Sequence, residues 1–254
     1  MLTVGVDLAA EPDGTAVARV DWTAGRATVA RVDVGVGDAA IVDAVAIADK
    51  AGIDCPLGWP VAFVEFLTAH HTGHVTVPAG VAGRVWRRRL AYRVTDEVVH
   101  RAVGRLPLSV AADRIGHTAM RAAALLSTLA ARGCPVDRGG DGVVVEVYPA
   151  ASLRIWGLPD RGYKRTANLP RLADLVDRLR AAAPWLDLGA HEPLCRGSDH
   201  AFDAVVAALT ARAAALDLAT RPAADEVAAA RTEGWIALPT APLDALIQGL
   251  PVRG

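Results

Sequence analysis

The sequence predicts an α/β protein in which helices flank a mixed β-sheet. Three observations lead to this prediction. The N-terminal part holds short β-branched segments joined by turn residues, as in antiparallel strands. The rest of the chain carries apolar residues at helical spacing, with proline or glycine at the segment ends. Between two helical segments lies a nearly continuous apolar run, which is typical of a strand covered on both faces.

Three antiparallel strands are expected at the N-terminus. The first is short, apolar and β-branched, and it ends at a Pro-Asp-Gly loop. The second and third alternate between apolar and polar residues. The Thr-Ala-Gly turn between them predicts a hairpin, with glycine at the position that needs a positive φ. The three strands are expected over residues 2–8, 15–22 and 26–34.

A helix, a fourth strand and an insertion are expected next. Residues 38–51 have the apolar spacing of a helix, and Gly52 follows at its expected C-terminal end. A very short apolar stretch before Pro56 predicts a strand with Asp54 at its carboxyl end. Residues 61–113 are expected to form a helical and loop insertion over the sheet, not a domain of their own. The expected helices of this insertion cover residues 61–70 and 94–103.

The C-terminal half is expected to add one buried strand and four helices. The strand, residues 142–148, is almost entirely apolar but carries one glutamate. The last helix has Ser198 as its N-cap. Residues 233–238 are expected to form either a short strand or a tail that packs back, and one domain covers residues 1–254. The helices are expected over residues 115–132, 150–156, 168–183 and 198–220.

Composition and charge exclude several classes of protein. With 27 basic and 28 acidic residues the formal net charge is −1, which excludes a globally basic nucleic-acid binder and an acidic disordered chain, but not a local basic patch. Three widely separated cysteines argue against a disulfide framework. Neither a secretory signal pattern nor an apolar run of about 18 residues is visible, so we expect a cytoplasmic protein that does not enter a membrane.

Four carboxylates occupy positions where an acid is costly. Asp7, Asp54 and Glu146 lie in or at the end of apolar strands, and Asp203 lies on a helix made otherwise of Ala, Val, Phe and Leu. A buried carboxylate needs arginine, backbone donors or a cation. Singly, each acid has a structural interpretation, as a turn cap, a loop contact, an arginine partner or a satisfied polar group. Together, carboxylates from different elements form the oxygen-only kind of site that holds Mg²⁺ or Mn²⁺.

Seven short motifs follow one another along the chain. They are Gly5-Val6-Asp7-Leu8-Ala9-Ala10, Ile53-Asp54-Cys55-Pro56-Leu57-Gly58, Arg93-Val94-Thr95-Asp96, Glu146-Val147-Tyr148-Pro149-Ala150, Tyr163-Lys164, Asp203-Ala204 with the following Ala-Leu-Thr-Ala run, and Glu233-Gly234-Trp235-Ile236. In this order they resemble family 429 of the domains of unknown function, whose members are described as predicted nucleases of the ribonuclease H-like fold. The resemblance extends from residue 3 to about residue 239.

The resemblance implies a three-layer ribonuclease H-like fold whose central mixed sheet has five strands in the order 3-2-1-4-5. A right-handed crossover then places the strand that ends at Asp54 beside the strand that carries Asp7. By the same resemblance, Asp7, Asp54 and Asp203 hold the metal ions of a nuclease, and Glu146 is a further ligand or a base that orients water. Two such ions about 4 Å apart would activate a water and stabilise the leaving oxygen of a phosphodiester.

A fourth metal ligand is left open by the sequence. The chain also resembles the Holliday-junction resolvase branch of this superfamily, in which the late helix carries two acids in the pattern Asp-x-x-Asp-Ala. Here His200 stands three residues before Asp203, and Asp199 stands four residues before it, so both are expected on roughly the same side of the helix as Asp203. Asp199, His200 and Glu146 are the candidates, and His200 is also a candidate contact for a substrate phosphate.

Candidate phosphate contacts have open alternatives. Arg93 and Asp96 are expected either to bind and orient a phosphate, which suits a bidentate guanidinium, or to form a surface ion pair. Lys164 is a candidate phosphate contact or a solvated loop residue. Seven arginines lie within residues 84–105, interleaved with two aromatic residues. They form a candidate nucleic-acid backbone patch, a solvated helix face or a set of partners for the protein's own acids.

The sequence therefore predicts a divalent-metal-dependent nuclease that acts on DNA or RNA. The main alternative is a binding module without turnover, which uses an acidic pocket and a basic rim to bind a nucleotide or a nucleic-acid end. An actin-like phosphotransferase fits less well. Leu-Ala-Ala follows Asp7 in place of a glycine-rich phosphate hairpin, and only one such hairpin is visible where two related domains are needed.

Overall fold

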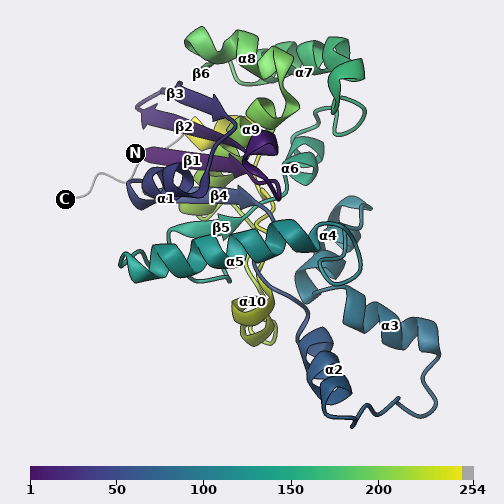
Figure 1. Ribbon diagram of the computed structural model, residues 1–254. Coiled ribbons are helices and arrows are strands. Elements are labelled where there is room, and N and C mark those ends of the chain that lie inside the picture. Colours follow the sequence, from purple (N-terminus) through teal and green to yellow (C-terminus); the bar gives the residue numbers. More distant parts are fainter. Residues whose placement is uncertain (248–254) are drawn as a thin grey trace.

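Six strands form one mixed sheet in the order β5-β4-β1-β2-β3-β6 in the computed structural model, which describes residues 1–247 (Figure 1). The first three strands are antiparallel, as expected, whereas β4 and β5 run parallel to β1. The prediction of an α/β protein with a mixed sheet flanked by helices is confirmed. The strands are β1 (Leu2–Asp7), β2 (Ala16–Thr23), β3 (Arg26–Val34), β4 (Lys50–Asp54), β5 (Val144–Glu146) and β6 (Leu186–Asp187).

The expected number of five strands is wrong, because β6 extends the sheet beyond β3. This strand has only two residues, which pair in parallel with Ala27 and Thr28 of β3. An ion pair between Arg26 and Asp187 joins the same two strands. A segment of two residues shows no alternation of apolar and polar positions, so no pattern in the sequence indicates it. Between β3 and β5 the strands lie in the order β3-β2-β1-β4-β5.

Helices cover both faces of the sheet (Figure 1). On one face, α1 and α5 share a hydrophobic core with Val4 and Val6 of β1. On the other face, α9 and α7 share a second core with Ala16, Ala18 and Val20 of β2. The helices of these layers are α1 (Asp38–Ala46), α5 (Gly116–Ala131), α6 (Pro149–Ile155), α7 (Leu169–Ala182), α8 (Glu192–Gly197) and α9 (Asp199–Ala215). None of the helices in residues 1–247 combines the length and the apolar composition needed to cross a membrane.

Helix α9 lies directly on the backbone of β1 and β4. Two glycines leave the room that this packing needs: a Cβ on Gly5 would lie 1.9 Å from the carbonyl oxygen of Ala204, and one on Gly52 would lie 2.6 Å from that of Ala207. Any larger residue at either position would push the helix away from the sheet. The close packing brings Asp203 of α9 onto the carboxyl ends of these two strands.

Helix α1 ends at Ala46, earlier than the predicted end at residue 51. Lys50 already belongs to β4, so Gly52 is a strand residue and does not terminate a helix. Ala48, whose spacing favoured the longer helix, packs against the same core from the turn between α1 and β4. At the other predicted cap, the side chain of Ser198 accepts a hydrogen bond from the backbone N–H of Ala201, three residues further along, as expected at the start of α9.

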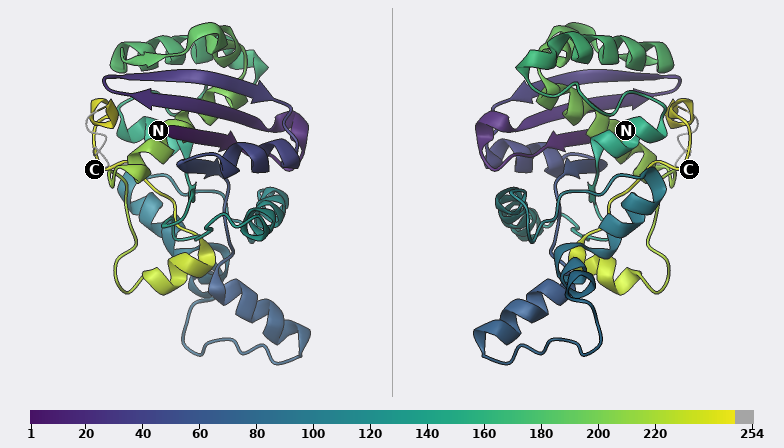
Figure 2. Two further views of the ribbon diagram at one scale, coloured as in Figure 1. Left: turned by 90° about the vertical axis from the view of Figure 1, so that its left-hand side faces the viewer. Right: turned by 90° about the vertical axis from the view of Figure 1, so that its right-hand side faces the viewer.

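Residues 61–92, named here the arm, stand away from the sheet instead of lying over it (Figures 1 and 2). The arm contains α2 (Val61–His71) and α3 (Gly83–Ala91), and neither helix has a buried residue. The next helix, α4 (Val94–Val103), returns to the body of the protein and contributes buried residues to it. Helix α10 (Val227–Glu233) contacts both α2 and α4 at the base of the arm.

Candidate metal centre

Three aspartates converge at the carboxyl ends of two neighbouring strands. Asp7 and Asp54 are the last residues of β1 and β4, and the parallel register pairs them directly. Asp203 reaches the same place from α9, so that one carboxylate oxygen of each residue lies within 4.8 Å of the other two. Asp7 and Asp203 are buried, and Asp54 is partly exposed. The structure thus brings together three of the acids that the sequence predicted as metal ligands.

Asp203 is held by two consecutive residues of the loop before α7. The hydroxyl of Tyr163 donates a hydrogen bond of 2.9 Å to Oδ1. The ammonium of Lys164 forms an ion pair of 2.5 Å with Oδ2, but this contact lacks hydrogen-bond geometry. Among residues 1–247, Oδ2 is therefore a buried oxygen without a hydrogen bond, which is the situation that a bound cation would relieve.

Asp7 is held by His200, one turn before Asp203 on α9. Nδ1 of His200 lies 2.6 Å from Oδ2 of Asp7, and this hydrogen bond raises the pKa of the imidazole. Asp199 lies outside the group, because its carboxylate accepts a hydrogen bond of 3.1 Å from the backbone of Arg165. Arg165 has a positive φ of 78°, so Asp199 stabilises a backbone conformation that is unfavourable for a residue with a side chain.

The three carboxylates repel one another, and the surroundings of Asp54 and Asp203 disfavour the ionised form. Desolvation raises the pKa of Asp54 well above its usual range, against the opposing charge of Lys164. Desolvation likewise raises the pKa of Asp203 to about 6, with Lys164 again opposing. Burial lowers the pKa of Lys164, but the neighbouring carboxylates, led by Asp203, outweigh burial and raise it. The group therefore needs positive charge, and Lys164 supplies part of it.

The donor set fits a hard divalent cation. All three side chains offer carboxylate oxygens, which Mg²⁺ and Mn²⁺ prefer, and no sulfur or second imidazole lies in the group. The buried Oδ2 of Asp203, which has an ion pair with Lys164 but no hydrogen bond, is the observation that favours a cation over an ordinary polar cluster. Asp7, Asp54 and Asp203 are therefore the residues that would hold the ion.

Glu146 points into a buried ion-pair network instead of the three-aspartate group. Both of its oxygens accept hydrogen bonds from the guanidinium of Arg93, at 2.7 and 2.8 Å, and Oε2 also accepts one from the backbone of Leu57. Arg93 makes a second double contact with Asp96, which sits three residues further along and caps α4 with it. Arg93 and Asp96 are 1% and 0% exposed. Arg93 and Asp96 therefore form an ion pair, but it is buried and not on the surface. The guanidinium of Arg93 is occupied by the carboxylates of Asp96 and Glu146.

A cavity of about 680 Å³ opens at Asp7 and Asp54. Besides the buried Arg93, four basic side chains line it: Arg105, Arg114, Arg161 and Lys164. A second cavity of about 590 Å³ shares two of these residues, Arg114 and Lys164, and reaches His200. No role was expected for Arg114, because a lone arginine in a loop has no distinguishing pattern. Tyr163 belongs to one of the family motifs, but nothing in the sequence indicated that it contacts Asp203.

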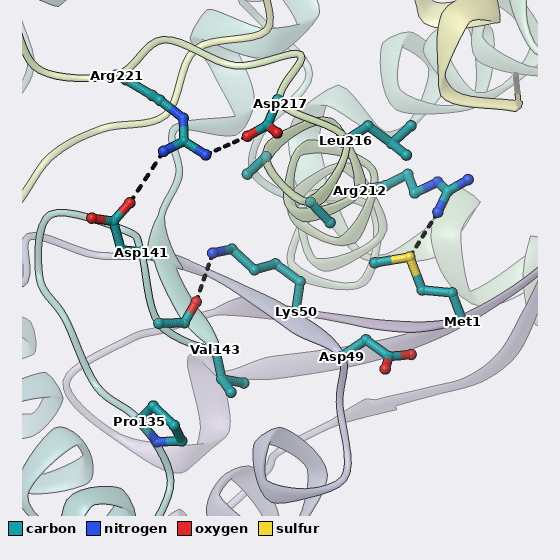
Figure 3. A pocket seen from close by; sticks show the side chains of 13 residues that line it. Met1, Asp49, Lys50, Pro135, Asp141, Val143, Arg212, Leu216, Asp217 and Arg221 are labelled. Carbon is teal, nitrogen blue, oxygen red and sulfur yellow. Dashed lines mark hydrogen bonds and ion pairs between the residues drawn. The ribbon is translucent and has the colours of Figure 1, made fainter. Parts of the chain in front are cut away.

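Another cavity, of about 820 Å³, lies at the opposite end of the sheet and has a different character (Figure 3). Its charged groups are engaged with one another: Arg221 pairs with Asp141 and Asp217. Lys50 donates to the carbonyl oxygens of Gly140 and Gly142 at 2.5 and 2.6 Å. These contacts join the starts of β4 and β5 to the end of α9, so we interpret this region as structural.

The raised pKa of Asp203 predicts a pH dependence of stability. Its carboxyl keeps its proton to about pH 6 in the folded protein and to about pH 4 in the unfolded chain, so the folded protein binds more protons between these values. The free energy of unfolding of the metal-free protein should then fall as pH rises. The contribution of Asp203 to this fall is on the order of 1–2 kcal/mol between about pH 5 and 7. Urea unfolding at several pH values should show that the free energy of unfolding falls less with pH in Asp203→Asn than in the wild type. An equal fall in both proteins would contradict the prediction.

Fold and site together define an α/β protein with a three-carboxylate candidate metal centre at the ends of two parallel strands. Residues 5–227 match the model of the family described as "Protein of unknown function (DUF429)", and the chain belongs to this family. The family indicated by the sequence motifs is thereby confirmed. No curated protein and no solved structure matches the chain.

Proposed function

We propose that this protein is a divalent-metal-dependent nuclease that hydrolyses phosphodiester bonds of DNA or RNA. The observation that carries the proposal is the convergence of Asp7, Asp54 and Asp203, with a buried oxygen of Asp203 that lacks a hydrogen bond. The strand order from β3 to β5 and the late helix that supplies the third acid support a ribonuclease H-like assignment of the fold. A protein of this kind acts on a phosphate ester at the edge of its sheet.

Each group of the site has a part in this function. Bound Mg²⁺ or Mn²⁺ supplies an activated water and charge compensation for the phosphate. The three aspartates hold the ion, while His200 and Tyr163 keep the carboxylates of Asp7 and Asp203 in place. Two ions require a fourth ligand. Of the candidates from the sequence, His200 is the one in contact with a carboxylate of the group, whereas Asp199 and Glu146 are engaged elsewhere.

The cations around the cavity are suited to a phosphate substrate. Arg114 has no ion pair within residues 1–247 and lines both cavities beside the aspartates. Lys164 is half exposed and contacts Asp203, so it can release that carboxylate to an arriving ion and turn to a phosphate. Lys164 was already a predicted phosphate contact, and Arg114 joins it. Arg93 and Asp96, the other predicted pair, have their polar groups engaged within the protein.

A binding module without turnover is the second candidate. It is favoured by the ion pair of Lys164 with Asp203, because a lysine that neutralises the acidic group makes that group stable without a metal ion. Cleavage of end-labelled single-stranded, duplex and branched DNA and RNA distinguishes the two candidates. The nuclease requires cutting with Mg²⁺ or Mn²⁺ that stops in EDTA. Binding of these substrates without any cutting would establish the binding module instead.

A further inference from the structure

The arm is a basic surface that the three-aspartate site does not use. Residues 61–92 contain four arginines and one acidic residue, Glu65. All four arginines lie on α3 and are exposed. One of them, Arg88, is paired with Glu97 and lies over the ring of Tyr92. The other three, Arg84, Arg87 and Arg89, have no ion pair within the part of the chain that the structure describes.

Packing inside the arm turns these arginines outward. Trp86 of α3 packs edge-on against Phe66 of α2, with ring centroids 5.8 Å apart, and it is less exposed than the arginines on either side. Arg84 and Arg87 lie two positions before and one position after Trp86, so they point away from the face of α3 that meets α2. Arg89 lies three positions after Trp86, nearer to that face, and is exposed as well. Arg84 and Arg89 are separated by about 7.5 Å along the helix, a length over which a polyanion presents several charges.

One carboxylate fixes both stems of the arm to the protein. Oε1 of Glu233 accepts a hydrogen bond from the backbone N–H of Val61, where the arm begins, and Oε2 accepts one from Val94, just after it ends; both are 2.8 Å long. The carbonyl oxygen of Glu233 accepts a third bond from Arg93, which is paired with Glu146. The base of the arm is therefore firmly attached, although its helices have no buried residues.

The same contacts attach the arm to the end of the sheet that carries the aspartates. The arm starts seven residues after Asp54, and Glu146, through Arg93, links its base to the backbone of Leu57 in the intervening loop. Beyond the arm the chain leads through α4 to Arg105, which lines the cavity above the aspartates. The arm therefore lies on the α4 side of the cavity, where a polyanion that is bound in the cavity and extends beyond it in that direction passes.

We propose that the arm binds the sugar-phosphate backbone of nucleic acid through Arg84, Arg87 and Arg89. Its charge complements phosphate, and a metal site for phosphodiesters lies at the same end of the sheet, so the identity of the partner rests on the proposed function. The contact is sequence-independent, because helix α3 offers guanidinium groups to phosphates and no groove-reading element is required. The arm thereby holds the substrate beside the site at a fixed distance from the aspartates.

Salt dependence of binding tests this directly. Binding of a labelled 30-base-pair DNA duplex in EDTA, which prevents metal-dependent cutting, is measured from about 50 to 300 mM salt for three proteins. They are the wild type, the triple variant Arg84→Gln, Arg87→Gln, Arg89→Gln, and a control triple variant of the same charge change, Arg31→Gln, Arg132→Gln, Arg178→Gln. The control arginines are surface residues in exposed ion pairs far from the arm.

We expect the arm variant to bind about tenfold or more weakly near 100 mM salt and to lower the slope of log affinity against log salt by about 2 to 3, because each lost phosphate contact removes about 0.9 from that slope. The control should stay within about twofold of the wild type. Replacement of the three arm residues by lysine should restore most of the slope, since it keeps the charge.

An unchanged slope and affinity in the arm variant would overturn the proposal, and so would a control variant that loses as much as the arm variant. Val64 and Leu67 of α2 are exposed, so sedimentation of the wild type and the arm variant is compared as well. If the arm arginines change self-association but not duplex binding, the arm is an interface between two copies and the proposal is wrong. Binding to vesicles with anionic lipid but not to DNA would overturn it in favour of a membrane surface.

These results are separable from the proposed activity. If the arm variant still cleaves nucleic acid and binds the duplex with unchanged affinity, the proposed nuclease activity stands and the proposed role of the arm is wrong. Arm-dependent binding without cleavage by any protein leaves the arm contact in place and removes the nuclease.

Discussion

Asp7→Asn is expected to lower metal-dependent cleavage by about 1,000-fold or more while leaving the protein folded. Asp7 pairs with Asp54 at the ends of two neighbouring strands, and its replacement removes one of the three carboxylates that would hold the ion. A bound metal stabilises the transition state by several kcal/mol, and each 1.36 kcal/mol is a factor of ten in rate. Asparagine keeps the shape of aspartate and can still hydrogen-bond to His200, so the loss should appear in activity and not in stability.

The measurement compares initial rates at saturating Mn²⁺ with the binding of Mn²⁺ observed by its paramagnetic signal. Asp199→Asn is the matched control, because Asp199 lies on the same helix as Asp203 but bonds to the backbone of Arg165. We expect this control to retain activity within about fivefold. Full activity of Asp7→Asn would remove the proposed site. A loss in Asp199→Asn as large as in Asp7→Asn would show that Asp199 is the fourth ligand after all.

Arg93→Met is expected to cost about 3–5 kcal/mol of the free energy of unfolding, the largest stability effect that we predict. Arg93 is 1% exposed and compensates two buried carboxylates, Glu146 and Asp96. Its removal leaves each of them buried with a backbone hydrogen bond but without a positive charge, which is far more costly than the loss of a surface ion pair. For a chain of this length the melting temperature should fall by about 10 °C or more.

Thermal and urea unfolding of the metal-free protein measure this effect. Arg88→Met is the control: it removes the ion pair with Glu97, whose partners are 43% and 32% exposed, and should change stability by less than about 1 kcal/mol. Combining Arg93→Met with Glu146→Gln and Asp96→Asn should recover part of the loss, since the uncompensated charges are then gone. Equal melting temperatures for Arg93→Met and Arg88→Met would contradict the network described here.

The acidic group itself was largely predictable from the sequence. An aspartate at the end of an apolar strand is a local pattern. The resemblance to the family implied the strand order, and a right-handed crossover in that order places the strands of Asp7 and Asp54 side by side. The register of β1 and β4 confirms that expectation, and Asp203 joins them from the helix that was expected to carry the third acid. Family membership was likewise evident from short motifs in a fixed order.

Side-chain partners were not predictable in the same way. Glu146 interrupts an apolar strand just as Asp7 does, yet it pairs with Arg93, a residue 53 positions away. Asp199 and His200 are adjacent on α9 and equally spaced candidates, but one faces Arg165 and the other faces Asp7. Asp7 and Glu146 thus share a local pattern in the sequence but differ in their partners, because different residues pack against them.

The sequence by itself determined five of the six strands, the main helices and the acids that end two strands, since these depend on the period of apolar residues and on the residues of turns and caps. Only the tertiary structure decided which acids remain free for a cation, where the arm stands and how Glu233 joins its two stems. The physical reason is that periodicity records only whether a side chain faces the core or solvent. The choice between Arg93, Lys164 and a metal ion as partner of a buried carboxylate depends on distances across chain separations of tens to hundreds of residues, and folding alone sets those distances.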